Sequence, residues 1–187
     1  MQKIILEESE FSFLESCEIE KIRLNLRLSD EINKKSILIT SSVEQEGKTS
    51  VALKLGCAMA DAGDKVLFVN LNCTKIFNHE ITPNVIYNTT IEKLDMISIN
   101  KTADWQQYGE SYQYILIDAP AMSVCKYNIA IADTCDVILL VIEANRLGYQ
   151  KILESIEELS IGSHKDIRVV LNRTKKAYGI FKKRVKR

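Results

Sequence analysis

The most constraining feature of this chain is an apolar run followed by a short polar turn and a Gly-Lys-Thr triplet. Residues 36–40 have the character of a buried strand, and Gly47, Lys48 and Thr49 open a helical pattern. Gly47 lets the backbone approach a phosphate, Lys48 supplies a positive charge, and the Thr49 hydroxyl is a suitable Mg²⁺ ligand. Unpaired N–H groups at the start of a helix attract an anion. The pattern therefore predicts a phosphate-binding loop for a nucleoside triphosphate with magnesium.

A second element of the sequence supports this prediction. The apolar residues 114–117 end in Asp118. In nucleotide hydrolases, an aspartate at the carboxyl end of a strand beside the phosphate loop holds magnesium directly or through water. The structural alternative is an ordinary β–α turn capped near Ser50, with Asp118 as a turn or capping residue. The two elements together favour the magnesium site.

The hydrophobic pattern predicts an α/β fold with a mostly parallel sheet. Six short apolar runs have the length of strands, and most lack the alternation of a half-exposed strand: Ser36–Thr40, Lys65–Asn70, Leu94–Ile99, Tyr114–Asp118, Val137–Ile142 and Ile167–Leu171. Helical periodicity lies at residues 50–62 and 148–160. Residues 72–90 are largely polar, and we expect them to leave the sheet. The expected architecture is a P-loop NTPase three-layer sandwich, with the nucleotide at the carboxyl ends of the strands.

Composition argues against several classes of protein. The chain has 187 residues, 46% hydrophobic and 27% charged, as in an ordinary soluble domain. No apolar run reaches the ~18 residues that span a bilayer, and the acidic Glu7 and Glu8 are unlike a signal peptide. Five scattered cysteines without C-x-x-C spacing argue against a zinc site or a redox dithiol. These features predict a cytoplasmic protein.

Charge divides the chain into an acidic body and a basic tail. Residues 173–187 contain eight Lys or Arg and no acidic residue, which leaves a net charge of −8 on the remainder. We expect a linker and helix at residues 1–30, a P-loop ATPase domain at 31–174 and a basic tail at 175–187. The tail is either a solvated terminus or a segment that contacts anionic lipid or an acidic partner. Nucleic acid is not expected as a partner, because the acidic body repels phosphate backbones.

The order of these motifs resembles one family: the bacterial tyrosine kinases of capsular and exopolysaccharide synthesis, a branch of the deviant-Walker P-loop ATPases. The similar segments are a helix ending at residues 23–26, the phosphate loop at 40–49, the second Walker strand at 66–72, the Walker B strand at 115–120 and the closing strand at 170–173. The family also has serine at the position of Ser42. Septum-site and plasmid-partition ATPases carry a lysine where this chain has Val43, which favours the kinase branch.

The resemblance implies a site for ATP and Mg²⁺. The expected nucleotide-binding residues are Glu46, Gly47, Lys48, Thr49, Ser50, Asn172 and Arg173. By the same resemblance, Thr49 and Asp118 hold Mg²⁺, and Asn172 contacts the base. The catalytic positions are Lys48, Asp118, Asn70 and Asn72, of which the last two are substituted.

Three departures from the family pattern predict weak or lost kinase activity. The family's second Walker strand ends in Asp-x-Asp, whereas this chain has Asn70 and Asn72, and a carboxamide cannot act as a general base. The Glu-x-x-Arg-x-x-Arg motif that joins subunits in a ring keeps only Arg23. The tyrosine-rich tail is reduced to Tyr178. Slow ATP hydrolysis is still compatible with these losses, because phosphoryl transfer depends mostly on positioning and charge.

Residues and resemblance leave three hypotheses open. The chain is a kinase-like ATPase that regulates polysaccharide synthesis and export, with weak or lost kinase activity. Alternatively, it is a non-catalytic regulatory paralogue that binds a transmembrane co-polymerase or activator, or a true kinase. The third hypothesis is a membrane-cycling ATPase of the septum-site type. The expected assemblies are a homo-oligomer or a hetero-oligomer with a related kinase, and the tail would give peripheral contact with the inner face of the plasma membrane.

Overall fold

One mixed sheet organises the part of the chain that the computed structural model describes, which is residues 3–6, 16–28, 36–71, 75–76, 79–80, 82–99, 105–161 and 166–174. Asn72, Tyr178 and the basic tail at residues 175–187 lie outside these residues. The eight strands follow the order β1-β6-β7-β3-β8-β2-β9-β10. Every neighbouring pair is parallel except β6 and β7.

The six strands that we expected from apolar runs all form. The strands of the sheet are β1 (Lys3–Ile4), β2 (Ser36–Ser41), β3 (Val66–Asn70), β6 (Ile86–Thr89), β7 (Leu94–Ser98), β8 (Tyr114–Asp118), β9 (Val137–Glu143) and β10 (Asp166–Asn172). For the six predicted strands, observed and expected bounds differ by at most one residue at either end. A separate antiparallel pair consists of β4 (Lys75–Ile76) and β5 (His79–Glu80).

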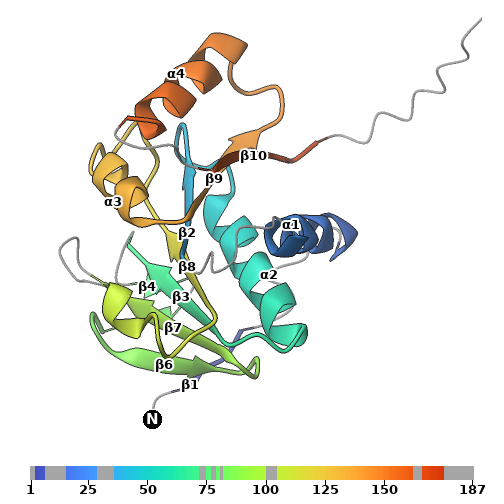
Figure 1. The fold of residues 1–187 in the computed structure, drawn as a ribbon, viewed down its shortest axis with the longest axis vertical. Coiled ribbons are helices and arrows are strands. Elements are labelled where there is room, and N and C mark those ends of the chain that lie inside the picture. Colours follow the sequence, from blue (N-terminus) through green and yellow to red (C-terminus); the bar gives the residue numbers. More distant parts are fainter. Residues whose placement is uncertain are drawn as a thin grey trace, which may run out of the picture.

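Helices cover both faces of the sheet, which confirms the α/β sandwich (Figure 1). Helices α1 (Ser16–Leu28) and α2 (Lys48–Asp61) lie on one side. The other side carries α3 (Asn128–Thr134), α4 (Tyr149–Leu159) and the 3-10 helix η2 (Trp105–Tyr108). Successive strand residues point to opposite faces, so Ile37 and Ile39 join the core beneath α2 while Leu38 joins the core beneath α3 and α4. Burial on both faces explains why β2, β3, β8 and β9 are continuously apolar. The edge strand β10 is partly exposed, and its Val169 and Leu171 are exposed apolar side chains.

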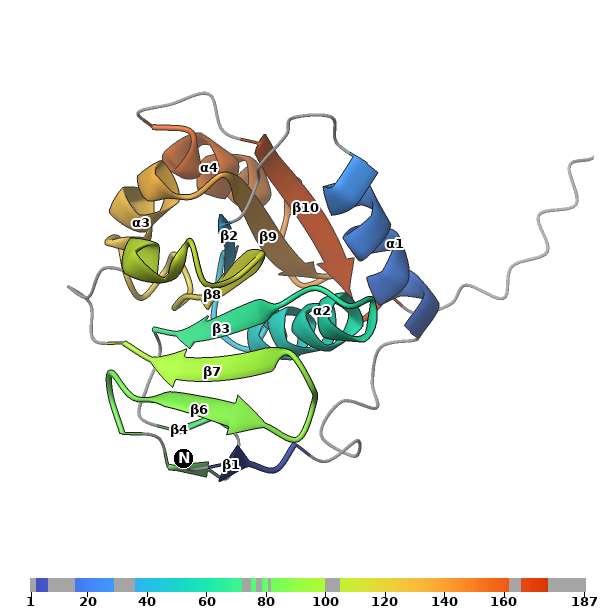
Figure 2. The ribbon, with the colours of Figure 1, turned by 60° about the horizontal axis from the view of Figure 1, so that its bottom comes forward.

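The polar stretch before β7 corrects one expectation. We expected residues 72–90 to leave the sheet, but residues 86–89 form β6, which pairs antiparallel with β7. The short strand β1 then pairs with β6 in parallel, with Lys3 opposite Asn88 (Figure 2). In β6 buried and partly exposed residues alternate. A strand near the sheet edge can therefore include polar residues, and its composition hid it.

The strand order decides which residues meet at the carboxyl edge of the sheet. β8 lies between β2 and β3, and the register places Asp118 opposite Ile39 on one side and Asn70 on the other. β9 pairs with the other side of β2, and β10 follows β9. The loop from β2 to α2 is therefore surrounded by the ends of β8, β9 and β10.

Cys57 in α2 gives a test of the packing on the α2 side of the sheet. Burial, with a smaller contribution from Asp61, raises the pKa of its thiol to about 12. Because the thiolate is the reactive form, we expect iodoacetamide at mildly alkaline pH to alkylate Cys57 at least ~100-fold more slowly than the exposed Cys17. Peptide mass spectrometry measures both rates. In urea the two cysteines should react alike, and similar rates in the folded protein would contradict this packing.

Candidate functional site

The loop between β2 and α2 has a backbone that requires glycine at one position. Gln45 and Gly47 both have positive φ angles, of 63° and 86°. A Cβ atom on Gly47 would lie 2.2 Å from Nδ2 of Asn172. Gly47 is therefore required both by its left-handed backbone and by the close approach of the Asn172 side chain.

Helix α2 begins at Lys48 in a way that suits an anion. Its N-cap residue, Gly47, makes no side-chain capping hydrogen bond, and the first turn has no acidic residue. The unpaired N–H groups and the positive end of the helix dipole favour negative charge at this point. Lys48, Thr49 and Ser50 lie in this first turn and are partly exposed. The three residues that we expected to contact phosphate therefore stand where a phosphate group has access.

Thr49 and Asp118 come together from separate elements. The Thr49 hydroxyl donates a hydrogen bond of 2.7 Å to Oδ2 of Asp118, which is the last residue of β8 and is 1% exposed. A hydroxyl and a carboxylate are the hard oxygen ligands that Mg²⁺ prefers, and Mg²⁺ often takes only one or two protein ligands beside phosphate and water. The donor set present here fits Mg²⁺ bound together with a nucleotide.

Asn70 stands beside this pair. It ends β3, is 2% exposed and lies opposite Asp118 in the β3–β8 register and opposite Ser98 in the β3–β7 register. A neutral carboxamide at this point offers an oxygen or an N–H group but accepts no proton. The structure thus places one of the two substituted positions next to Asp118, and Asn72 lies outside the described residues.

Glu46 holds the phosphate loop together from inside. Its carboxylate is fully buried and accepts hydrogen bonds from the backbone N–H of Val43, at 3.0 Å, and of Glu143, at 3.1 Å. The side chain thereby ties the loop to the end of β9. Its carboxylate oxygens are occupied in this way, so a phosphate contact from Glu46 would come from its backbone.

Asn172 and Arg173 close the loop from the end of β10. Nδ2 of Asn172 donates to the Glu46 carbonyl at 2.9 Å, and its Oδ1 accepts from the N–H of Arg173. The Arg173 guanidinium donates to the Gln45 carbonyl at 3.2 Å and to Glu143 at 3.1 Å. In this structure the Asn172 side chain supports the phosphate loop, and its expected contact with the base stays a prediction.

Glu143 also belongs to this site, although the sequence motifs did not indicate it. It ends β9 and binds both Arg173 and Arg146, each at 3.1 Å. Burial acts to raise the pKa of Glu143, but the hydrogen bonds from the two arginines outweigh it and hold the pKa below its usual value. The sequence could have indicated Glu143 because it is a charged residue at the end of an apolar run. The pairing of β9 with β2, which places it beside the phosphate loop, comes from the structure.

Comparison with known proteins finds relatives in sequence and in fold. No family model matches the chain. The tyrosine-protein kinase CpsD of Streptococcus agalactiae is 23% identical over 193 residues, which cover 86% of this chain and 83% of CpsD.

Among solved structures, the chimerical protein CapA2B2 matches with a TM-score of 0.76 and 19% identity, over 93% of this chain and 94% of that one. The VpsO kinase domain matches with a TM-score of 0.72 and 21% identity, over 86% and 94%. The MinD cell division protein of Aquifex aeolicus matches with a TM-score of 0.61 and 21% identity, over 75% and 70%. The fold is that of the P-loop NTPases.

Substitution of Gly47 tests the loop. We expect Gly47→Ala to weaken ATP binding at least ~10-fold, because alanine is strained at a φ of 86° and its Cβ displaces Asn172. Isothermal titration calorimetry measures the affinity, and thermal unfolding reports any loss of stability.

Gly148 supplies the matched control. It has a φ of −70° before α4, and a Cβ there would meet nothing within 4 Å. Gly148→Ala should leave both affinity and melting temperature close to those of the wild type. Equal ATP affinity in Gly47→Ala and wild type would contradict the loop as the phosphate site.

Proposed function

We propose that this chain, a P-loop protein similar in sequence and fold to the bacterial tyrosine kinases, binds Mg–ATP and has weak or lost kinase activity. The observation that carries the proposal is the hydrogen bond from Thr49, in the first turn of α2, to Asp118 at the end of β8. The neutral Asn70 beside Asp118 supports the second half of the proposal.

Each residue of the site has a distinct function in binding. The Lys48 side chain and the first N–H groups of α2 bind the phosphates. Thr49 and Asp118 hold Mg²⁺, which neutralises charge on the phosphate oxygens when it is bound. The side chains of Glu46 and Asn172 hold the conformation of the loop through hydrogen bonds to its backbone. All of these contacts serve binding and positioning.

Catalysis lacks a group that accepts the proton of an attacking hydroxyl at the position of Asn70. Loss of a general base typically costs roughly 10²–10⁴-fold in rate. Positioning and charge remain, so we infer slow ATP hydrolysis or none, and weak transfer to tyrosine. A protein of this kind would act mainly through its nucleotide-bound state.

We infer a regulatory function in capsular or exopolysaccharide synthesis, at the cytoplasmic side of the membrane. The similarity to CpsD supports this inference. The partner would be a transmembrane activator or a related kinase. Arg23, the arginine kept from the family's subunit motif, is engaged within α1: its Nε donates to Glu20 at 2.8 Å.

Membrane contact through the basic tail is a second candidate function. None of the helices in the described ranges is long and apolar enough to cross a bilayer. Residues 175–187 contain five lysines, two arginines and three larger apolar residues at helical spacing. Such a segment suits an anionic lipid surface.

Binding and turnover together test the main proposal. We expect wild type to bind Mg–ATP in calorimetry. Lys48→Ala should bind at least ~10-fold more weakly, because the positive charge that would contact the phosphates is lost. Asn70→Asp, alone or with Asn72→Asp, should raise ATP turnover by at least about 10-fold by restoring a proton acceptor.

The outcomes of this test are separable. Wild type that binds no Mg–ATP, or binds it no better than Lys48→Ala, would overturn the binding proposal. Wild-type turnover that Asn70→Asp leaves unchanged would show that the loss of activity has another cause.

The tail is tested by sedimentation with liposomes. We expect full-length protein to sediment with vesicles that contain anionic lipid and a variant that ends at residue 174 to stay in the supernatant, because each basic residue contributes about 1 kcal/mol near such a surface. Neutral vesicles are the control. Equal sedimentation of both forms would remove the membrane function of the tail.

A further inference from the structure

The chain continues past Asp118 in contact with the phosphate loop. Backbone hydrogen bonds join Ala119 to Ile39 at 3.0 Å, Met122 to Ser41 at 2.8 Å and Ser123 to Ser42 at 3.1 Å. The pairing of β2 with β8 is thus extended beyond the strands, up to Ser42, the first residue after β2. Any shift of residues 119–123 would move Asp118 relative to that loop.

Asn128 holds this extension from the side. It is the first residue of α3 and is 0% exposed. Its Nδ2 donates to the Pro120 carbonyl at 2.6 Å and contacts the Thr40 hydroxyl at 3.2 Å, while that hydroxyl donates to the same carbonyl at 2.8 Å. The Asn128 amide therefore joins three elements: Thr40 near the end of β2, Pro120 in the segment after Asp118, and the start of α3.

The Asn128 side chain is costly to bury. Its Oδ1 has no hydrogen-bond partner among the residues that the structure describes. A buried carbonyl without a donor is unfavourable, and an apolar residue of similar size avoids this cost. An apolar residue could not donate the two hydrogen bonds that Nδ2 of Asn128 makes. One contact is to the Thr40 hydroxyl and the other is to the Pro120 carbonyl. Thr40 lies two residues before Ser42 and Pro120 two residues after Asp118, so both flank the proposed magnesium site.

We propose that Asn128 is a positioning residue that holds the Asp118 carboxylate at a set distance from the phosphate loop, so that magnesium strengthens nucleotide binding. The proposal rests on the proposed function, because it concerns the same site. Asn128 does not itself contact the nucleotide or the metal. Its effect passes through Pro120 and Thr40, and it also links this site to α3.

Calorimetry with ATP, in the presence of Mg²⁺ and in EDTA, separates positioning from general stability. We expect Asn128→Ala and Thr40→Val each to reduce the Mg²⁺-dependent gain in affinity roughly 5-fold, as for the loss of one hydrogen bond. Affinity in EDTA should change less than about 2-fold, because neither substitution alters residues 42–47 or Lys48. The double variant should lose little more than either single one, since both act through one network.

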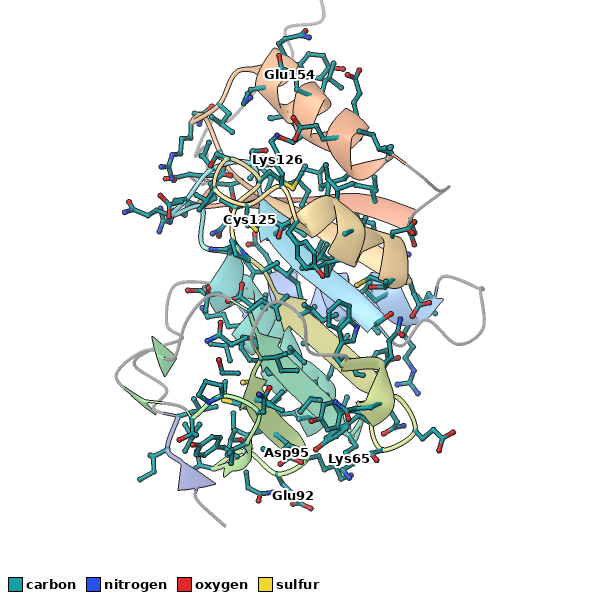
Figure 3. All side chains as sticks on the ribbon, turned by 90° about the vertical axis from the view of Figure 1, so that its left-hand side faces the viewer. Lys65, Glu92, Asp95, Cys125, Lys126 and Glu154 are labelled. Atoms are coloured by element: carbon teal, nitrogen blue, oxygen red, sulfur yellow. The ribbon has the colours of Figure 1, made fainter. Side chains whose placement is uncertain are left out.

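Asn88 provides the matched control. Its amide donates to Asp95 at 2.9 Å between β6 and β7. Figure 3 places Asp95 near Lys65, at the end of the molecule away from Cys125 and Lys126, which precede α3. Asn88→Ala should leave the Mg²⁺-dependent gain unchanged. A gain that is equal in wild type, Asn128→Ala and Thr40→Val would overturn the proposal.

Amide hydrogen exchange without nucleotide tests the same network independently. We expect the N–H groups of Met122 and Ser123 to exchange at least ~5-fold faster in Asn128→Ala and Thr40→Val than in wild type, since their local opening becomes easier. Unchanged exchange would also overturn the proposal. If wild type binds no ATP, the proposed function fails while this measurement still decides the positioning. If Asn128→Ala does not fold, Thr40→Val decides both measurements.

Discussion

Thr49 and Asp118 are 69 residues apart in sequence, and their 2.7 Å hydrogen bond exists because β2 and β8 are parallel neighbours. The phosphate loop begins where β2 ends, and Asp118 ends the adjacent strand, so the pairing brings the loop and the carboxylate to one edge. The pairing is held by burial of both strands from both faces, with Leu38, Leu116 and Ile117 all at 0% exposure. Loss of this packing would separate the two halves of the proposed magnesium site.

Hydrogen bonds from β9 and β10 hold the phosphate loop in shape. Glu46 binds the backbone at both Val43 and the end of β9, and Asn172 reaches in from β10 to the Glu46 carbonyl. A loop that is already ordered loses less conformational entropy when a phosphate binds. At the described positions, the hydrogen bonds that would support a bound phosphate are therefore present. Within the described part of the nucleotide site, Asn70 departs from the pattern of the family that the chain resembles. This is a change of chemistry at an unchanged place in the sheet, because a fold can be kept while the chemistry of its site differs.

Much of the fold was predictable because the dominant signals are local. Six continuous apolar runs indicated the parallel strands, and Gly47 marked the start of α2. β6 escaped prediction because a strand near the sheet edge exposes part of its side chains, so Asn88 and Thr89 resemble a loop in composition. α3 escaped because seven residues are too few to show a clear helical period.

The sequence by itself predicted the ligand class and the substituted proton acceptor, because Gly47, Lys48, Thr49 and Asp118 follow strands in a recognisable order and Asn70 is a change of residue type. Only the tertiary structure decided how the site is held. The side chains of Glu46, Asn172 and Asn128 come from three different parts of the chain and bond to backbone groups of the loop, of β9 and of the segment after Asp118. Glu143, from a fourth part, accepts hydrogen bonds from the guanidinium groups of Arg146 and Arg173. Such contacts depend on strand order and register, which no local pattern of residues encodes.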